Sequence, residues 1–317
     1  MPASHPLSRR ATLLGLALAG MSPLVGRTLA ADGREVVHTL GTATISGKPQ
    51  RVLVISDFTD LEYTLALGAR PVAYGATGAW ARGGLPWQQL DTPLETFDMS
   101  AQEVKPEIVA SYAPDLIIGM ATYLEPVLPQ LQQLAPVVAL DWSMPWRDGL
   151  RIVAAALDEA ALAETRITGT EALIARTAER LKPLAGRKVM IGSNYGGTLY
   201  VIGEGPIATL FRGLGLDFVA ARGDAELVEY SLENVDVLAE AEILLSLASD
   251  AEGTATLEAL PTFRRLPAVA ARAYAPVDSV LSSGFVDNFS PLSAPWALPR
   301  LAELLTGLAA GQGKALG

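Results

Sequence analysis

The sequence of 317 residues contains no cysteine and only two histidines, His5 and His38. Without cysteine the chain forms no disulfide, no thiolate metal site and no lipid-anchored N-terminal cysteine. A zinc or manganese carrier would need several histidines, so the sequence disfavours that class of protein. The G-x-S-x-G motif is also absent, which argues against a serine hydrolase of the α/β-hydrolase type.

Basic residues are scarce as well. Lys and Arg number 24 against 34 Asp and Glu, which gives a net charge of −10. Residues 1–30 hold three of the arginines and no acid, so the rest of the chain has 21 basic and 34 acidic residues, or −13. This balance argues against nucleic acid or an anionic membrane surface as the main partner. Half of the residues are apolar, enough for the core of one large domain or two modest ones.

Residues 1–30 have the pattern of an export signal. Arg9 and Arg10 lie in the twin-arginine pattern Ser-Arg-Arg-Ala-Thr-Leu-Leu, an apolar run continues through Ala19, and small residues precede Ala30. The apolar run is too short to span a membrane, so we expect a signal peptide cleaved near Ala30 rather than an anchor. We therefore expect a soluble monomer in the periplasm.

A single long helix is predicted from about Ala160 to Lys182. Charged residues alternate there with a stripe that recurs every three or four positions, as on one helical face. The stripe consists of Ala163, Ile167, Thr170, Ile174, Thr177 and Leu181. Pro183 ends the helix because its ring clashes with the preceding turn. At 1.5 Å per residue the helix is roughly 34 Å long, about the width of a small domain.

Strand and helix patterns alternate on both sides of this helix. Before it we expect strands at Val36–Leu40, Arg51–Ile55, Pro71–Gly75, Pro114–Ile118 and Pro136–Leu140, and helices at Asp60–Leu67, Glu107–Tyr112 and Glu125–Leu134. After it we expect strands at Arg187–Gly192, Thr198–Ile202, Ile243–Leu247 and Ala273–Val277, and helices at Ile207–Leu214 and Trp296–Leu308. We also expect Ser231 to cap a helix that runs to about Ala239. We expect Ser282–Ser293 to form a loop.

This alternation predicts an α/β fold with two lobes of mainly parallel sheet joined by one long helix. The expected boundaries are a signal peptide at 1–30, a first lobe at 31–147, a linker helix at 148–183 and a second lobe at 184–317. A long segment from Thr77 to Asp98 contains Trp80 and Trp87, and loops of this length in compact domains are usually functional or disordered.

The segment Pro114–Ile118, with Glu107 ahead of it, resembles the periplasmic binding proteins that feed iron-siderophore, haem and cobalamin transporters. The similarity is strongest to the ferric hydroxamate-siderophore binders and extends over about Val36–Leu305. It is supported by Lys48–Val52, Leu67–Val72 and Leu266–Val269. The resemblance implies the class III periplasmic binding protein fold, in which one long helix bridges two lobes and the ligand lies in a shallow cleft between them.

A ferric trihydroxamate surrounds its metal completely, so the protein needs an aromatic wall and one or two hydrogen-bond donors rather than metal ligands. The resemblance places a ligand-contacting arginine near Arg82, whose guanidinium offers fixed donors and stays charged. The alternatives are a solvated loop arginine, and core packing for the aromatic residues. The predicted ligand-binding residues are Trp80, Arg82, Trp87, Tyr123, Tyr230, Phe285 and Asn288.

The resemblance also assigns Glu107 and Glu233, one in each lobe, to docking on arginines of the transporter's membrane subunits. Both fall in first helical turns, where an acid also stabilises the helix dipole. Trp142 and Trp146 follow a predicted strand and could line the cleft or pack the hinge, and we favour packing. The stretch Gly203–Ala208 is similar to a dinucleotide-binding fingerprint, but a turn with Pro opening a helix explains it.

The sequence therefore predicts the substrate-binding component of an ABC importer, not an enzyme, that binds a ferric siderophore of hydroxamate type. Its partners would be that siderophore and a permease dimer, with no permanently bound cofactor and iron carried inside the ligand. Three alternatives stay open. They are a haem binder with Tyr63, Tyr74 or Tyr123 as axial ligand, a catecholate-siderophore binder, and an exported hydrolase.

Overall fold

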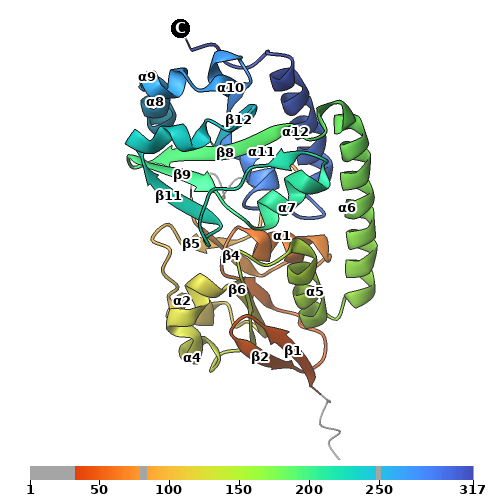
Figure 1. Ribbon diagram of the computed structural model, residues 1–317. Coiled ribbons are helices and arrows are strands. Elements are labelled where there is room, and N and C mark those ends of the chain that lie inside the picture. Colours follow the sequence, from red (N-terminus) through yellow and green to blue (C-terminus); the bar gives the residue numbers. More distant parts are fainter. Residues whose placement is uncertain (1–32, 79–83, 248–250, 317) are drawn as a thin grey trace, which may run out of the picture. The chain divides into compact units, whose positions relative to one another are not determined.

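The computed structural model describes residues 33–78, 84–247 and 251–316. They form two α/β lobes joined by helix α6, Ala160–Leu181 (Figure 1). The predicted long helix is confirmed to within one residue, and the short 3-10 helix η3, Lys182–Leu184, contains the proline expected to end it. Within the described residues, no helix is long and apolar enough to cross a membrane.

The first lobe is built on a parallel five-stranded sheet with the order β5-β4-β3-β6-β7. Its strands are β3 (Val52–Val54), β4 (Ala73–Ala76), β5 (Thr96–Asp98), β6 (Leu116–Met120) and β7 (Val137–Leu140). Four of them are buried along their whole length, which explains their unbroken apolar patterns. The chain winds outward from β3 to β5 and returns to β6 beside β3, so the loops after β3 and β6 flank a topological switch point.

Helices cover this sheet, and a separate antiparallel ribbon of β1 (Arg34–His38) and β2 (Gly41–Ile45) adjoins it at β7. The helices are α1 (Thr59–Ala66), α2 (Pro106–Ser111), α3 (Ala121–Leu124), the 3-10 helix η2 (Glu125–Val127), α4 (Leu128–Leu131) and α5 (Trp146–Leu157). Helix α5 ends at Asp158, whose backbone is left-handed (φ 62°). The range 148–183 therefore holds most of α5 together with α6, rather than one continuous helix.

The second lobe contains a mixed six-stranded sheet with the order β11-β9-β8-β12-β13, and β10 beside β8. Its strands are β8 (Lys188–Tyr195), β9 (Thr198–Ile202), β10 (Asp217–Phe218), β11 (Leu227–Ser231), β12 (Ile243–Leu247) and β13 (Tyr274–Val277). Strands β8, β10, β12 and β13 run parallel, whereas β8–β9 and β9–β11 are antiparallel pairs. The β8–β9 turn is made by Gly196 and Gly197, both with positive φ, as tight hairpins require.

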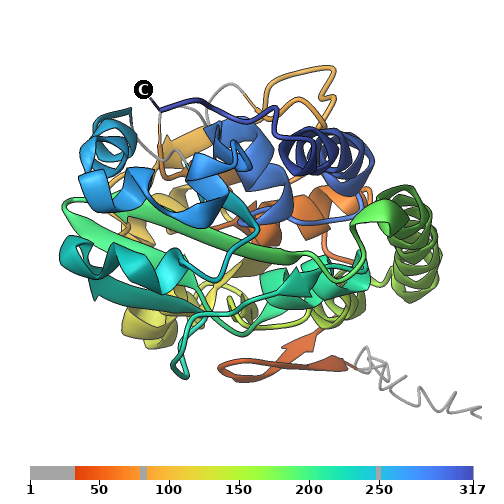
Figure 2. The same cartoon turned by 45° about the horizontal axis from the view of Figure 1, so that its top comes forward.

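Helices lie on both sides of the second sheet (Figure 2). They are α7 (Pro206–Gly213), the 3-10 helix η4 (Leu232–Leu238), α8 (Ala251–Ala259), α9 (Pro261–Arg264), α10 (Pro267–Ala270), α11 (Ser279–Phe285) and α12 (Ala294–Ala309). The expectation that Ser282–Ser293 forms a loop is wrong over its first residues, which belong to α11. Asp278 caps this helix, because its Oδ1 accepts from the backbone N–H groups of Val280 and Leu281 at 3.1 and 3.0 Å.

One apolar core runs through both lobes. It includes Ile117 of the first sheet, Ile167 of α6, Ile191 of the second sheet and Leu298 of α12. Helix α12 packs directly on α6, and the two lie side by side in Figure 2. A second core covers the other face of the second sheet. The two lobes are thus tied together by shared packing as well as by the covalent link of α6.

Candidate ligand-binding site

A cavity of about 420 Å³ lies between the two lobes. The first lobe contributes residues from α1, from the end of β7 and the loop after it, and from α5. The second contributes residues from β8, β9, β11, β12, α7 and the segment at the end of α11. The lining residues are Thr59, Tyr63, Leu140, Asp141, Trp142, Met144, Trp146, Gly149, Ser193, Ile202, Pro206, Ile207, Leu210, Glu226, Leu227, Leu247, Phe285, Val286, Asp287 and Phe289.

Aromatic rings form a large part of the cavity wall. Trp146 meets Phe289 edge to face with ring centres 5.9 Å apart, so this contact joins the first lobe to the second. Trp142 is held by Phe58, whose ring is 4.9 Å away at 74°. It nevertheless leaves 37% of its surface exposed. Both tryptophans pack on neighbouring rings and also line the cavity, so the less favoured of the two expectations, cleft lining, applies to both.

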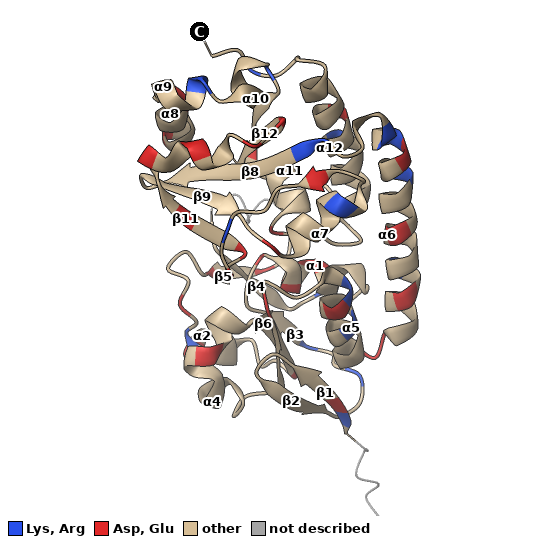
Figure 3. Cartoon of the chain, viewed as in Figure 1, with Lys and Arg blue, Asp and Glu red and all other residues tan. Residues whose placement is uncertain are grey.

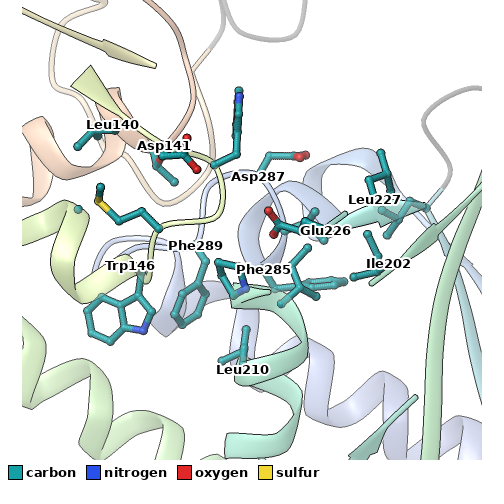
Figure 4. Close-up of a pocket in the computed structure, with 18 of the residues that line it drawn as sticks. Leu140, Asp141, Trp146, Ile202, Leu210, Glu226, Leu227, Phe285, Asp287 and Phe289 are labelled. Carbon is teal, nitrogen blue, oxygen red and sulfur yellow. The ribbon is translucent and has the colours of Figure 1, made fainter. Parts of the chain in front are cut away.

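Carboxylates occupy one side of the cavity. In Figure 4, Asp141, Glu226 and Asp287 lie above the rings of Trp146 and Phe289. Burial raises the pKa of Glu226 to about 7, with smaller contributions from the charges of Asp141 and Asp287. Burial raises the pKa of Asp287 to about 6, and the charge of Asp57, on the segment after β3, contributes less. None of the described residues that line the cavity is Lys, Arg or His.

The position of Glu226 depends on two glycines. The backbone N–H of Gly203 donates to the Glu226 carbonyl at 2.8 Å. A Cβ at Gly205 would lie only 2.9 Å from Glu226 Cγ, so no other residue fits there without moving the acid. Gly203 and Gly205 therefore allow the chain before α7 to approach the chain before β11 closely. Pro206 opens α7, as expected for the stretch that is similar to a dinucleotide-binding fingerprint.

Further buried carboxylates lie behind the cavity, on the segment after β3. Asp57 is only 2% exposed. Its Oδ1 accepts from Thr77 Oγ1 at 2.7 Å, whereas its Oδ2 has no partner in the described part of the chain. It is Asp57 whose charge acts on Asp287. Asp60 is fully buried and accepts from the backbone and hydroxyl of Ser56; burial raises its pKa to about 7.

Glu62 of α1 connects the two lobes. Its Oε2 accepts from Trp87 Nε1 at 3.0 Å and from Ser290 Oγ of the second lobe at 2.9 Å, and its Oε1 accepts from Gln88 Nε2 at 2.8 Å. The side chain is completely buried. Burial raises the pKa of Glu62 to about 7 despite these three donors. This carboxylate holds α1, the segment around Trp87 and the segment before α12 together.

The structure brings only some of the predicted ligand-binding residues to the cavity. Phe285 lines it. Tyr123 lies beside it, with its ring 6.4 Å from Trp142, and burial raises the pKa of its hydroxyl to about 12. Asn288 is buried next to Asp287, with its amide 2.7 Å from Ser283 Oγ.

The remaining predicted residues lie elsewhere. Trp87 packs on Trp296 with ring centres 5.1 Å apart, outside the cavity lining. Tyr230 belongs to β11 and packs against the second core rather than facing the cavity. Trp80 and Arg82 lie outside the described residues. Their predicted roles remain predictions.

The two predicted docking acids are both exposed, each in the first turn of a short helix. Glu107 lies in α2, and Glu233 lies in η4, where Ser231 caps the helix as expected. Helix α2 and strand β11, which leads into η4, are both at the left of Figure 1, opposite α6. Figure 3 shows acidic residues on that side of both lobes.

Sequence reasoning missed the acidic side of the cavity, because its three carboxylates come from distant segments. Two signals pointed to them in part. Asp141 directly follows a buried parallel strand, and such positions line ligand sites in α/β folds. Asp287 lies between the predicted residues Phe285 and Asn288. Nothing in the sequence around Glu226 indicates that β9 and α7 would bring it into the cavity.

The sequence matches a family model. The model of the periplasmic binding protein family matches residues 99–278, more than half of the chain. The chain belongs to this family. Periplasmic binding proteins capture solutes for transport and are not a family of enzymes. No curated protein matches the sequence at a significant level.

Solved structures share the fold over nearly their whole length. A periplasmic solute-binding protein from Mycobacterium smegmatis aligns with a TM-score of 0.77 at 23% identity, over 88% of this chain and 99% of that one. The Streptococcus pneumoniae protein PiaA, solved with ferrichrome, gives 0.72 at 22% identity, over 88% and 99%. Staphylococcus aureus SirA, complexed with staphyloferrin B, gives 0.69 at 18% identity, over 86% and 98%. The predicted class III architecture is thereby confirmed.

Proposed function

We propose that this periplasmic binding protein captures a ferric siderophore of hydroxamate type between its lobes and delivers it to an ABC importer. The observation that carries the proposal is the aromatic-walled cavity between two lobes that one long helix joins. Its volume of about 420 Å³ is within the range of roughly 300–1,000 Å³ for small-molecule sites. The proteins of similar fold that were solved with ferrichrome and with staphyloferrin B support a siderophore as the ligand.

The charge of the cavity favours a hydroxamate over a catecholate complex. A ferric tris-hydroxamate core is neutral, whereas a ferric tris-catecholate carries three negative charges. Asp141, Glu226 and Asp287 line this cavity without any described Lys, Arg or His to balance them. Like charges brought close together in a poorly solvated site repel one another strongly. Among the described residues, the cavity lining offers nothing that would balance the charge of a trianionic ligand.

The tyrosines favour the siderophore over haem. A tyrosine that binds haem iron does so as the phenolate. Burial raises the pKa of Tyr63, of Tyr74 and of Tyr123, the last to about 12. Tyr74 does not line the cavity. These environments disfavour the ionised form in each of the three residues that were candidates for an axial ligand.

Delivery would use Glu107 and Glu233 as docking points on the permease dimer, one acid on each lobe. Two exposed acids that meet two arginines of a symmetric partner would fix the orientation of the complex and speed encounter. The export signal of residues 1–30, with its twin arginines, would place the mature protein in the periplasm, where it would act as a monomer.

Quenching of tryptophan fluorescence tests the proposed ligand, because Trp142 and Trp146 line the cavity. Mature protein would be titrated with a ferric trihydroxamate, a ferric tricatecholate and haem. We expect saturable quenching at one-to-one stoichiometry with the trihydroxamate and much weaker quenching with the other two. A Phe285→Ala variant should weaken trihydroxamate binding. Equal or tighter binding of the tricatecholate or of haem would overturn the assignment to hydroxamates.

A further inference from the structure

We propose that the siderophore of this protein carries a positively charged amine, and that Glu226 and Asp287, supported by Asp141, bind that amine. This inference rests on the proposed function and narrows the class of ligand. It concerns the pendant groups of the siderophore rather than its iron centre. A neutral ferric trihydroxamate with a free primary amine would have a net charge of +1.

The carboxylates act as a group. The charges of Asp141 and Asp287 both act on Glu226, although the three residues come from segments after β7, before β11 and after α11. The neighbouring side chains on the lining are apolar or aromatic, such as Leu227 and Phe285. Such surroundings solvate carboxylates poorly, so three acids on the lining of one cavity carry a cost in free energy that a cation would offset.

A second observation points to the same ligand charge. Asp57 is almost completely buried, and its Oδ2 has no hydrogen-bond partner in the described residues. Its charge acts on Asp287, so it adds to the negative potential on the acidic side of the cavity. Buried carboxylate oxygens are normally paired. Asp57 is outside the cavity lining, so a bound ammonium group would contact Asp287 and offset the charge of Asp57 only through space.

An ammonium group fits this site better than a metal ion does. No group of three or more Asp, Glu or His within the described residues converges closely enough to hold a metal. A primary ammonium needs less convergence, because its three N–H donors can each meet a different acceptor. The aromatic rings of the cavity also favour a cation, since the faces of aromatic rings attract positive charge. The alkyl chain that carries the amine could pack on Leu227 and Trp142, which both line the cavity.

Glu226 is positioned for this role by the Gly203–Gly205 stretch. A side chain at Gly205 would collide with the Glu226 side chain, so the glycine preserves the place of the carboxylate beside Pro206 and Ile207 of the lining. The glycines of this stretch would thus serve to position Glu226 rather than to bind a nucleotide. Gly205→Ala should displace the acid without removing its charge.

The test uses three ferric complexes of one linear trihydroxamate that ends in a primary amine. The first keeps the free amine, the second has it acetylated and is neutral, and the third has it succinylated and is anionic. Dissociation constants come from quenching of tryptophan fluorescence in mature wild-type protein at pH 8. We expect the amine form to bind at least tenfold more tightly than the acetylated form, and the succinylated form to bind most weakly. A hydrogen bond to a charged group is worth a factor of this size.

Variants then assign the preference to the carboxylates. The double variant Glu226→Gln/Asp287→Asn should bind the amine and acetylated forms with nearly equal affinity. Its affinity for the amine form should fall, whereas its affinity for the acetylated form should stay that of the wild type. The matched control is Glu229→Gln, an exposed acid three residues along the chain and outside the cavity lining, which should leave the preference unchanged. Circular dichroism of each variant verifies that it is folded.

The outcomes separate this inference from the proposed function. If wild-type protein binds all three complexes with the same affinity, the amine site is wrong and the hydroxamate function stands. If the preference survives in the double variant, the carboxylates are not its source and the inference is also wrong. If none of the three complexes binds, the hydroxamate function itself fails.

Discussion

Replacing Glu62 with glutamine should change how the stability of this protein depends on pH. The Glu62 carboxylate is completely buried, and its pKa is raised from 4.5 to about 7. Between these two values the folded protein keeps a proton that the unfolded chain has lost. The free energy of unfolding therefore falls as pH rises from 4.5 to 7, and stays lowered at higher pH. One pKa unit corresponds to 1.36 kcal/mol, so the total loss is about 3 kcal/mol.

Glutamine cannot ionise, so Glu62→Gln removes this loss. Its amide oxygen can still accept from Trp87 and Ser290, which both donate to Oε2 in the wild type. The variant has its own offset in stability, because its amide group faces the Gln88 side chain that donates to Oε1. That offset is the same at every pH. Between pH 5 and pH 8 the variant should therefore gain about 2–3 kcal/mol of unfolding free energy relative to wild type.

Urea denaturation of the mature chain, followed by circular dichroism at pH 5 and pH 8, measures this difference. The matched control is Glu229→Gln, because Glu229 is exposed on β11. Its difference from wild type should be almost independent of pH. A difference between Glu62→Gln and wild type that is equal at the two pH values would refute the reasoning, since it would mean that Glu62 ionises alike in folded and unfolded protein.

Four other predictions concern the ligand, docking, motion and export. Arg82→Ala should weaken binding of the ferric trihydroxamate by about 1.5–3 kcal/mol, the range for hydrogen bonds to charged groups, and an unchanged dissociation constant would return the residue to an ordinary loop role. Glu107→Ala and Glu233→Ala should each reduce uptake modestly, because exposed ion pairs contribute about 0.2–1 kcal/mol, whereas the double variant should abolish uptake but keep its affinity for the siderophore; normal uptake by the double variant would disprove docking. X-ray scattering curves with and without ligand should nearly overlay, and a large fall in radius of gyration would contradict a stiff helical bridge. Arg9→Lys/Arg10→Lys should prevent accumulation in the periplasm, and normal accumulation would show that the twin arginines are not the signal.

The carboxylates that line the cavity should make binding of the amine form depend on pH. The carboxylates of Glu226 and Asp287 ionise around pH 7 and pH 6, with Asp141 and Asp57 as the neighbouring acids. Above these values they attract the ammonium, which stays protonated because a primary amine has a pKa of about 10. The amine form should therefore bind more tightly at pH 8 than at pH 5, whereas the acetylated form should not. Fluorescence titrations at both pH values would show this, and equal preference at both would count against the acids.

The sequence predicted the parts of the fold that local patterns determine. Helix α6 was found from its apolar stripe, and Ala163, Ile167 and Leu181 of that stripe are buried against the shared core. The buried parallel strands were found because both of their faces are covered, which produces short unbroken apolar runs. Strand β11 was missed, because an exposed antiparallel strand with alternating polar residues has no such run. Helix α11 was missed because Ser and Gly are weak helix formers, although its Asp278 cap was visible in the sequence.

The candidate site was less predictable than the fold. Phe285 was placed near the ligand by family resemblance, and it lines the cavity. The acidic residues were not foreseen, because no spacing along the chain relates Asp141 to Glu226 or to Asp287. Their proximity is created by how the lobes pack across the cavity. A charge pattern of this kind is tertiary information, and it becomes visible only when distant segments are placed together.

The shared core and the Glu62 contacts have a consequence for how loaded and unloaded protein would bind the proposed permease. Because Ser290 of the second lobe donates directly to Glu62 of the first, the lobes cannot separate far without leaving a buried carboxylate short of a donor. Empty and loaded protein would then present almost the same outer surface, so the permease would bind both. Empty protein would then compete with loaded protein for the proposed docking site. Uptake at a fixed, limiting siderophore concentration should rise with expression of this protein, pass through a maximum, and decline once unloaded copies outnumber loaded ones.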